Sequence, residues 1–509
     1  MKFNHNTKAA NTTINHQGAK AFLFTPEMEL YTAVATTLLT DACYEKADAR
    51  LKRMQDLMQK VEPQFVAKLA VYARNKMYLR TAPVVMATEL AKLHQGDRLV
   101  SKTIAGIVQR PDEIMELLAC YQAFNKRTAT KKLNRLSKQV QKGLAVAFNR
   151  FDEYQFAKYN RSTTVKLKDA LFLVHPKPKD DAQQALFNKI VADTLATPYT
   201  WETELSALGQ QSYESEAVKK AAIKAKWEEL IDSRKLGYMA LLRNLRNIMQ
   251  AEVSGEHMQK VTDYLSNENA VKQSKQLPFR FLSAYTEVKQ LQSFYTGAVM
   301  NALEAAVQIS IQNMEGLGND TRVVIACDTS GSMMQAVSPK SVVQLYDIGL
   351  MLGMLLQLKC RQVQTGMFGD TWKIIPLPTN NVLANVETLR RRNGEVGYST
   401  NGYLVLKDLI DRKQVADKVM LFTDMQLWDS NTGNASTVNT LSHQWKQYKQ
   451  IAPDAKLYVF DLAGRGQAPI SPKENDVYVI AGWSDKVFSV LDAIENGADT
   501  LSEIRSIEL

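Results

Sequence analysis

One stretch decides the fold of the second half of the chain, and it reads Val323-Val-Ile-Ala-Cys-Asp-Thr-Ser-Gly-Ser-Met333. Its first four residues are apolar and mostly β-branched, which is typical of a buried strand. Asp328, Ser330 and Ser332 follow that strand with the spacing Asp-x-Ser-x-Ser. Short polar residues also cap helices. The triplet alone therefore allows two interpretations, a helix cap or a ligand site at the end of a strand.

Further short apolar runs follow this stretch, and helix-length segments separate most of them. The predicted strands are Val323–Ala326, Val363–Phe368, Trp372–Leu377, Val419–Phe422, Leu457–Phe460 and Val477–Ile480. Strands that alternate with helices predict a doubly wound α/β domain, whose mostly parallel sheet is covered on both faces. Ligands of such sheets bind at the carboxyl ends of the strands. We assign this domain to residues 319–509.

Two polar residues from separate loops are expected to join the triplet at that edge. Thr400 precedes a helix-length segment, with Ser399 as an alternative hydroxyl, and Asp424 follows a buried strand. Hard oxygen donors are the ligands that Mg²⁺ prefers. The set resembles the metal-ion-dependent adhesion site of von Willebrand factor A domains, which implies Mg²⁺ or another divalent cation as cofactor. The predicted ligands are Asp328, Ser330, Ser332, Thr400 and Asp424.

The residues before this domain predict helix after helix. Apolar residues recur at three- and four-residue steps from Leu51 to Tyr72, and similar patterns continue to Met314. No strict repeat period is present, so an irregular HEAT-like array is expected over residues 21–318. Residues 1–20 are rich in Asn and Thr and form a polar N-terminal extension without the apolar core of a secretory signal.

Charge is concentrated in the helical half. The chain has a net charge of +10, and residues 121–180 hold 14 Lys and Arg against 4 Asp and Glu. A concentrated positive field attracts polyanions such as nucleic acids, although a solvated basic face is the plainer alternative. No apolar run is long enough to span a bilayer, and the four cysteines form no Cys-x-x-Cys pair. We therefore expect a cytoplasmic protein without a membrane partner, disulfide framework or zinc knuckle.

Three phrases in the helical half carry a second resemblance. Residues 71–80 (VYARNKMYLR), 238–248 (YMALLRNLRNI) and 277–281 (LPFRF) resemble the signature phrases of the TROVE module. Followed by an A domain, this module is similar to the Ro ribonucleoprotein family, including its bacterial members. The resemblance implies a monomeric ring of helical repeats closed by the A domain. It also implies an RNA chaperone in RNA quality control, not an enzyme.

The same resemblance implies RNA partners. Small structured non-coding RNA (Y-like RNA) would bind the outer surface, and single-stranded 3′ ends of misfolded RNA would enter a central channel. An exoribonuclease bridged by the RNA is a further candidate partner. Lys158 and His175 fall in step with the family's contact residues, whereas the family's arginine position is Ser162, beside Arg161. Phosphates attract basic side chains, so the candidate outer contacts are Lys158, Arg161, Lys166, Lys168 and His175.

The arginines of the signature phrases have two interpretations. They could face the channel, or they could bridge neighbouring helices, which is the commoner use of arginine in helical arrays. These residues are Arg74, Arg80, Arg243, Arg246 and Arg280. The rival function class is a protein-interaction scaffold in which RNA binding is incidental. Sequence motifs of common enzyme classes, such as a Walker A loop or His-Glu-x-x-His, do not occur, so no catalytic residue is predicted.

Overall fold

The computed structural model describes residues 12–36, 47–124, 136–160, 164–310, 321–337, 341–433, 436–483 and 486–509. The chain forms two compact units. One unit combines residues 1–57 with residues 265–503, and the other combines residues 58–264 with residues 504–509. The first will be called the sheet unit and the second the helical unit. The two units are described separately.

The sheet unit is built on a six-stranded sheet with the strand order β5-β4-β3-β6-β7-β9. All neighbouring strands are parallel except the edge strand β5, which is antiparallel to β4. The strands are β3 (Arg322–Asp328), β4 (Gln362–Phe368), β5 (Trp372–Ile374), β6 (Lys418–Thr423), β7 (Lys456–Asp461) and β9 (Val477–Ala481). This confirms the predicted α/β sheet, since each predicted strand overlaps an observed one.

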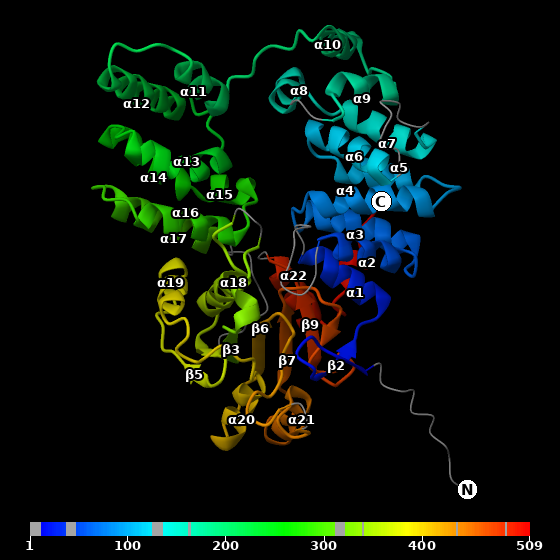
Figure 1. Ribbon diagram of the computed structural model, residues 1–509, viewed down its shortest axis with the longest axis vertical. Coiled ribbons are helices and arrows are strands. Elements are labelled where there is room, and N and C mark those ends of the chain that lie inside the picture. The colour runs from blue at the N-terminus through cyan, green and yellow to red at the C-terminus, as the bar shows by residue number, and fades with distance from the viewer. Residues whose placement is uncertain are drawn as a thin grey trace. The chain divides into compact units, whose positions relative to one another are not determined.

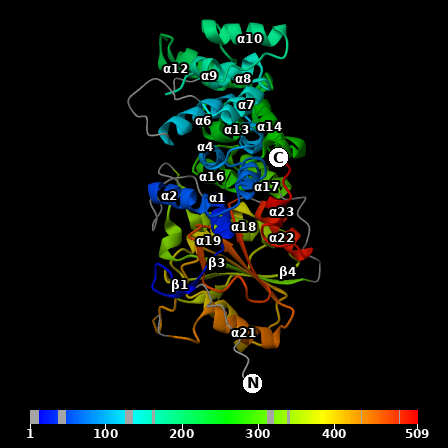
Figure 2. The same ribbon diagram turned by 90° about the vertical axis from the view of Figure 1, so that its right-hand side faces the viewer.

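Helices cover both faces of this sheet. The views in Figures 1 and 2 place α18 and α22 on one side of the strands and α21 on the other. Helix α18 lies close to β3, because a side chain at Gly353 would meet the Cys327 Sγ atom at 3.1 Å. The helices of this unit after β3 are α18 (Leu345–Lys359), α19 (Leu383–Arg391), α20 (Tyr403–Asp411), α21 (Leu441–Ile451), α22 (Lys486–Glu495) and the short α23 (Ser502–Arg505).

Residues near the N-terminus complete the sheet unit. Strand β1 (Thr12–Ile14) pairs with β2 (Lys20–Leu23), and β2 pairs with β8 (Gln467–Ala468) far along the chain. The Tyr31 hydroxyl donates to the Ala481 carbonyl at 2.9 Å, which ties α1 to β9. The remaining helices of this unit are α1 (Pro26–Ala35), α2 (Ala47–Met58), α15 (Glu268–Ser274), α16 (Pro278–Lys289) and α17 (Thr296–Ser310). The N-terminal extension thus contains strand residues that its polar composition does not indicate.

The helical unit is an irregular array, as predicted. The apolar pattern from Leu51 to Tyr72 is divided between α2 and α3, because Pro63 begins a new helix where it donates no hydrogen bond. The helices are α3 (Pro63–Asn75), α4 (Thr81–Leu93), α5 (Leu99–Ile107), α6 (Pro111–Phe124), α7 (Lys138–Phe148), α8 (Glu153–Tyr159), α9 (Leu167–Val174), α10 (Asp181–Ala192), α11 (Trp201–Gly209), α12 (Glu216–Asp232), α13 (Tyr238–Gln250) and α14 (Gly255–Leu265).

Candidate metal centre and nucleic-acid interface

The Asp-x-Ser-x-Ser segment lies where β3 ends. All three side chains are buried. The Ser330 N–H donates to the Asp328 Oδ1 atom at 2.9 Å, and the Oγ atoms of Ser330 and Ser332 lie 3.4 Å apart. Two ligands of one Mg²⁺ ion are at most about 4.2 Å apart, twice its bond length to oxygen. The two serine hydroxyls are therefore close enough to contact one ion.

The neighbouring strand β6 brings a second carboxylate to this edge. The Thr423 hydroxyl donates to the Asp328 Oδ2 atom at 2.6 Å, and the next residue is the fully buried Asp424. The Asp424 Oδ1 atom accepts from the Gln426 N–H at 3.1 Å. Two carboxylates thus meet at the carboxyl ends of two adjacent parallel strands, where ligands of such sheets bind.

Thr400 is joined to the loop that follows Asp424. Its hydroxyl donates to the Gln426 carbonyl at 2.9 Å and accepts from the Trp428 N–H at 3.2 Å. The neighbouring Ser399 turns toward another group, since its N–H donates to the Asp370 carboxylate at 2.8 Å. The Thr400 hydroxyl therefore contacts the loop that follows Asp424, and one of its oxygen lone pairs is left for a further partner.

The electrostatics of this edge favour a cation. Burial, with the nearby Asp424 carboxylate as the second cause, raises the pKa of Asp328 to about 7. Five oxygen donors, two of them carboxylates, match the chemistry of a hard divalent ion. No group of three or more His, Cys, Asp and Glu side chains that could hold a metal ion occurs among the described residues, so this edge offers two carboxylates and three hydroxyls instead. The chemistry of these oxygen donors therefore fits a divalent cation. One cationic side chain of the same chain already lies beside Asp424.

That neighbour is Arg465, which sequence reasoning missed. An Arg465 NH2 atom lies 3.3 Å from the Asp424 Oδ2 atom, and the two side chains are 2% and 0% exposed. Arg465 belongs to the loop after β7, 41 residues beyond Asp424. Sequence spacing alone gives no signal for such a pair, because the two loops meet only through the order of the strands.

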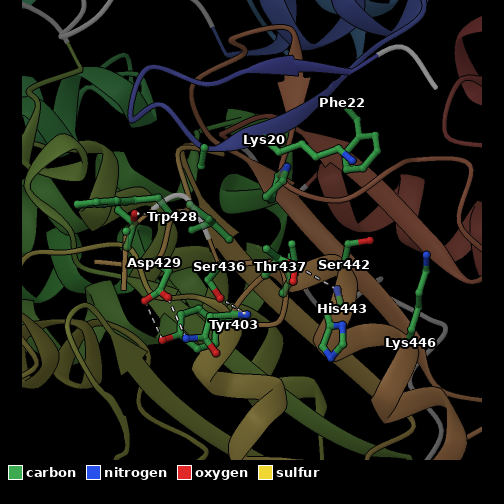
Figure 3. A pocket seen from close by; sticks show the side chains of 18 residues that line it. Lys20, Phe22, Tyr403, Trp428, Asp429, Ser436, Thr437, Ser442, His443 and Lys446 are labelled. Atoms are coloured by element: carbon green, nitrogen blue, oxygen red, sulfur yellow. Dashed lines mark hydrogen bonds between the residues drawn. The ribbon is translucent and has the colours of Figure 1, made fainter. Parts of the chain in front are cut away.

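A pocket of about 350 Å³ opens beside Thr400. Lys20 and Phe22 of the N-terminal hairpin lie on one side of it, and His443 and Lys446 of α21 lie on the other, as Figure 3 shows. The Asp429 carboxylate at its base is already held by hydrogen bonds from Tyr403, Thr432 and Asn439. The pocket therefore combines an aromatic ring with cationic side chains.

The predicted outer RNA contacts lie on α8 and α9 of the helical unit. Lys158, Lys166, Lys168 and His175 are all exposed to solvent. His175 ends α9 in the left-handed conformation, with a φ of 48°. Arg161 and the neighbouring Ser162 lie outside the described residues. Lys158 and Lys168 thus lie on two consecutive helices, and Lys166 and His175 flank the second of them.

Two aromatic side chains on the same helices were not predicted. Phe172 is 50% exposed, and it follows Lys168 by four residues and precedes His175 by three. Helical residues four apart share one face, so Phe172 lies beside Lys168, and His175 follows directly after the helix end. Tyr154 is 45% exposed, and the Lys158 Nζ atom lies 5.6 Å from its ring centroid. Half-exposed rings between basic residues are a signal for nucleic-acid binding that a search for charge alone overlooks.

The arginines of the signature phrases fall into two groups. Arg74 of α3 pairs with Glu113 of α6 at 2.8 Å, and Arg80 at the start of α4 pairs with Asp112 of α6 at 3.0 Å, so both bridge different helices of the array. Arg243, Arg246 and Arg280 are exposed on α13 and α16. The helix-bridging interpretation thus describes the contacts of the first group, and the second group can meet solvent or a ligand.

The molecule therefore belongs to the class that joins a helical array to a mostly parallel α/β sheet with an oxygen-rich site. The crystal structure of the Deinococcus radiodurans RO (RSR) protein has the same fold, with a TM-score of 0.58 and 17% sequence identity. That match covers 93% of this chain and all of the other. Within the described ranges, no helix has the length and apolar character needed to cross a membrane.

Sequence comparison then gives the family. The family model for the TROVE domain matches residues 11–220 and 194–299, and the chain belongs to this family. Telomerase protein component 1 is 25% identical over 351 residues in Mus musculus and 25% identical over 345 residues in Rattus norvegicus. Each match covers 52% of this chain but only 13% and 12% of those proteins, so the chain spans a small part of their length.

Proposed function

We propose that this chain is the RNA-binding protein of a small ribonucleoprotein and binds a structured, Y-like non-coding RNA on α8 and α9. Membership of the TROVE family supports an RNA-binding role. The observation that carries the proposal is the exposed set on these helices, in which Lys158, Lys168 and His175 accompany Phe172. Lysines neutralise phosphates, and an exposed ring offers a base a stacking surface.

A single-stranded 3′ end of misfolded RNA is the second proposed ligand. Arg243 and Arg246 are three residues apart on α13 and exposed, so they can contact consecutive phosphates of a flexible strand. Such contacts read the backbone and not the base sequence. The proposed role is RNA chaperoning and quality control without catalysis.

The sheet unit is proposed to hold Mg²⁺ or another divalent cation. Asp328, Ser330 and Ser332 would hold the ion from the end of β3, and Thr400 and Asp424 would complete its shell. A bound divalent ion would attract a carboxylate from a partner. The chain's own residues do the rest: they position the oxygen donors at the sheet edge and exclude bulk water by their burial.

A second candidate function, capture of a protein partner, is favoured by the pocket beside Thr400. Lys20, His443 and Lys446 line it, and the Asp429 carboxylate is occupied by its own hydrogen bonds. The pocket therefore suits an acidic segment, whose carboxylate could reach the proposed ion. This function is compatible with RNA binding by the other unit.

The RNA proposal is tested by replacing Lys158, Lys166 and Lys168 with Ala. Binding of a small structured RNA should weaken, and the slope of log affinity against log salt should fall by roughly 0.7–0.9 for each phosphate contact removed. Fluorescence anisotropy over a salt series measures both. The matched control replaces Lys407, Lys413 and Lys473, which are exposed in the sheet unit. Equal slopes for the two triple variants would reject α8 and α9 as the interface.

A further inference from the structure

We infer that the Arg465 side chain competes with the divalent ion of the proposed metal site for the Asp424 carboxylate. This inference rests on the proposed metal function and goes beyond it. Arg465 and Asp424 form an ion pair at 3.3 Å in which both side chains are essentially buried. Arginine stays protonated at any physiological pH, so its positive charge is permanent. Asp424 therefore already has a cationic partner from its own chain.

The buried charges at this edge are nearly balanced without an ion. Asp328, Asp424 and Asp461 supply three carboxyl groups, and Arg465 and Arg50 supply two guanidinium groups, all buried. Burial raises the pKa of Asp461 to about 6, and the charges of Arg465 and Arg50 act in the opposite direction. A divalent ion added to both guanidiniums would leave an excess of buried positive charge, which is costly. The ion and the Arg465 guanidinium are therefore alternatives at Asp424.

The loop that carries Arg465 is fixed in place on both sides. The Asp461 Oδ1 atom accepts from the N–H groups of Ala463 and Gly464 at 2.9 and 2.7 Å. From the N-terminal segment, Arg50 donates to the Ala463 carbonyl at 2.6 Å, and Arg53 donates to the Gly464 carbonyl at 2.7 Å. Because the backbone is held, displacement of the guanidinium has to come from rotation of the Arg465 side chain.

Gly464 is required by this arrangement. Its φ is +62°, and a Cβ atom would lie 2.2 Å from the Thr36 Oγ1 atom and 2.5 Å from the Thr32 carbonyl oxygen. Only glycine adopts this conformation next to α1 without strain. The packing of α1 against the loop thus sets the position from which Arg465 reaches Asp424.

The test measures Mn²⁺ and Mg²⁺ affinity by calorimetry for the full chain and for Arg465→Gln. Removal of the competing charge should tighten binding by about 5- to 150-fold, the usual range of coupling between linked sites. Arg465→Lys keeps a positive charge and should bind more weakly than Arg465→Gln. Arg391→Gln, whose side chain is 68% exposed, is the control and should bind as the parent chain does.

The outcomes separate the two ideas. Equal, measurable affinities for the parent chain and Arg465→Gln would overturn the competition and leave the metal site standing. No binding by either chain at millimolar ion would overturn both. If Arg465→Gln does not fold, the parent chain decides: saturating Mg²⁺ should shift the Nε–H resonance of Arg465, assigned from its absence in Arg465→Lys. An unchanged resonance in the presence of bound ion would overturn the inference.

Discussion

At the scale of the residue, burial and charge act on one carboxyl group. The pKa of Asp328 is about 7 in the folded protein, against an ordinary value of 3.8. Between these values the folded protein keeps a proton that the unfolded chain releases. Stability from this group is therefore fully present below pH 3.8 and is lost as the pH rises to about 7. The negative charge of the Asp328 carboxylate thus weakens the fold at neutral pH, and the same carboxylate would bind the proposed divalent ion.

Asp328→Asn should therefore raise the stability of the ion-free protein at alkaline pH and abolish its stabilisation by a divalent ion. At pH 8 with a chelator, the variant should be more stable than the parent chain by on the order of 2–4 kcal/mol, and the difference should shrink toward pH 4. Mn²⁺ should stabilise the parent chain but not the variant. Asp370→Asn is the control with the opposite sign, because hydrogen bonds from Ser399 lower the pKa of Asp370. Chemical denaturation at several pH values measures these differences, and a difference that does not change with pH would contradict the expectation.

Phe172→Ala tests stacking separately from charge. If a base stacks on this half-exposed ring, the change should cost about 1–3 kcal/mol of RNA-binding free energy, with the salt slope unchanged. Phe294→Ala removes a ring that is 94% exposed in the sheet unit and should have no effect. Anisotropy titrations at two salt concentrations distinguish the outcomes. Loss of affinity with a reduced slope would instead show that Phe172 only supports its basic neighbours.

At the scale of the element, the hairpin formed by β1 and β2 contacts the loop after Asp424 and pairs with β8, which follows the loop that carries Arg465. The Asn15 Nδ2 atom donates to the Leu427 carbonyl at 3.0 Å, and the His16 N–H donates to the Gln426 side chain at 2.8 Å. Strand β2 also pairs with β8, two residues beyond Arg465. The hairpin therefore helps to position the segment after Asp424 and the segment that carries Arg465.

Asn15→Ala should loosen this element. The buried side chain also accepts from the Gln17 and Ala19 N–H groups at 3.0 and 2.9 Å, so its removal leaves several polar groups unsatisfied. We expect a loss of about 1–3 kcal/mol of stability together with a changed Mn²⁺ affinity. Ile14→Ala, on the same hairpin but 68% exposed, is the control. If thermal unfolding and calorimetry gave the same values for both variants, the hairpin would not position the site.

Elements differed in how well the sequence predicted them. The strands of the main sheet were predicted because continuous apolar runs such as Val419–Phe422 follow from burial on both faces. Strands β1, β2 and β8 were missed because they are short and partly polar, and pairing with distant residues creates them. The pair of Arg465 and Asp424 was missed because the two residues are far apart in sequence. The proximity of Asp328, Ser330 and Ser332 was predicted because they are close in sequence.

At the scale of the whole molecule, each compact unit combines segments from both sides of residue 318, the predicted domain boundary. Helices α15 to α17 belong with the sheet, and Glu304 of α17 accepts from the N–H groups of Val382, Leu383 and Ala384 at the start of α19. Lys289 of α16 pairs with Glu387 at 2.7 Å. A helix start stabilised by a carboxylate from another element depends on that element.

Residues 319–509 should therefore not fold stably without the rest of the sheet unit. Expressed alone, the fragment should lack a cooperative thermal transition, because it loses α1, α17 and the pairing of β2 with β8. Co-expression with residues 1–318 should restore the transition. Circular dichroism and calorimetry provide the measurement. A fragment that melted cooperatively near the temperature of the full chain would show that the boundary at residue 318 is also a folding boundary.

The division of the sheet unit between two separate segments also has a consequence for biosynthesis. Strand β2 leaves the ribosome long before its partner β8, with 443 residues between Leu23 and Gln467. At about 5–20 residues per second this interval is roughly 20–90 s. During that time the helical unit can fold, while the edge of β2 that later pairs with β8 remains unpaired. An unpaired strand edge is a template for aggregation. Nascent chains of this protein should therefore depend on chaperones until the last third has been translated.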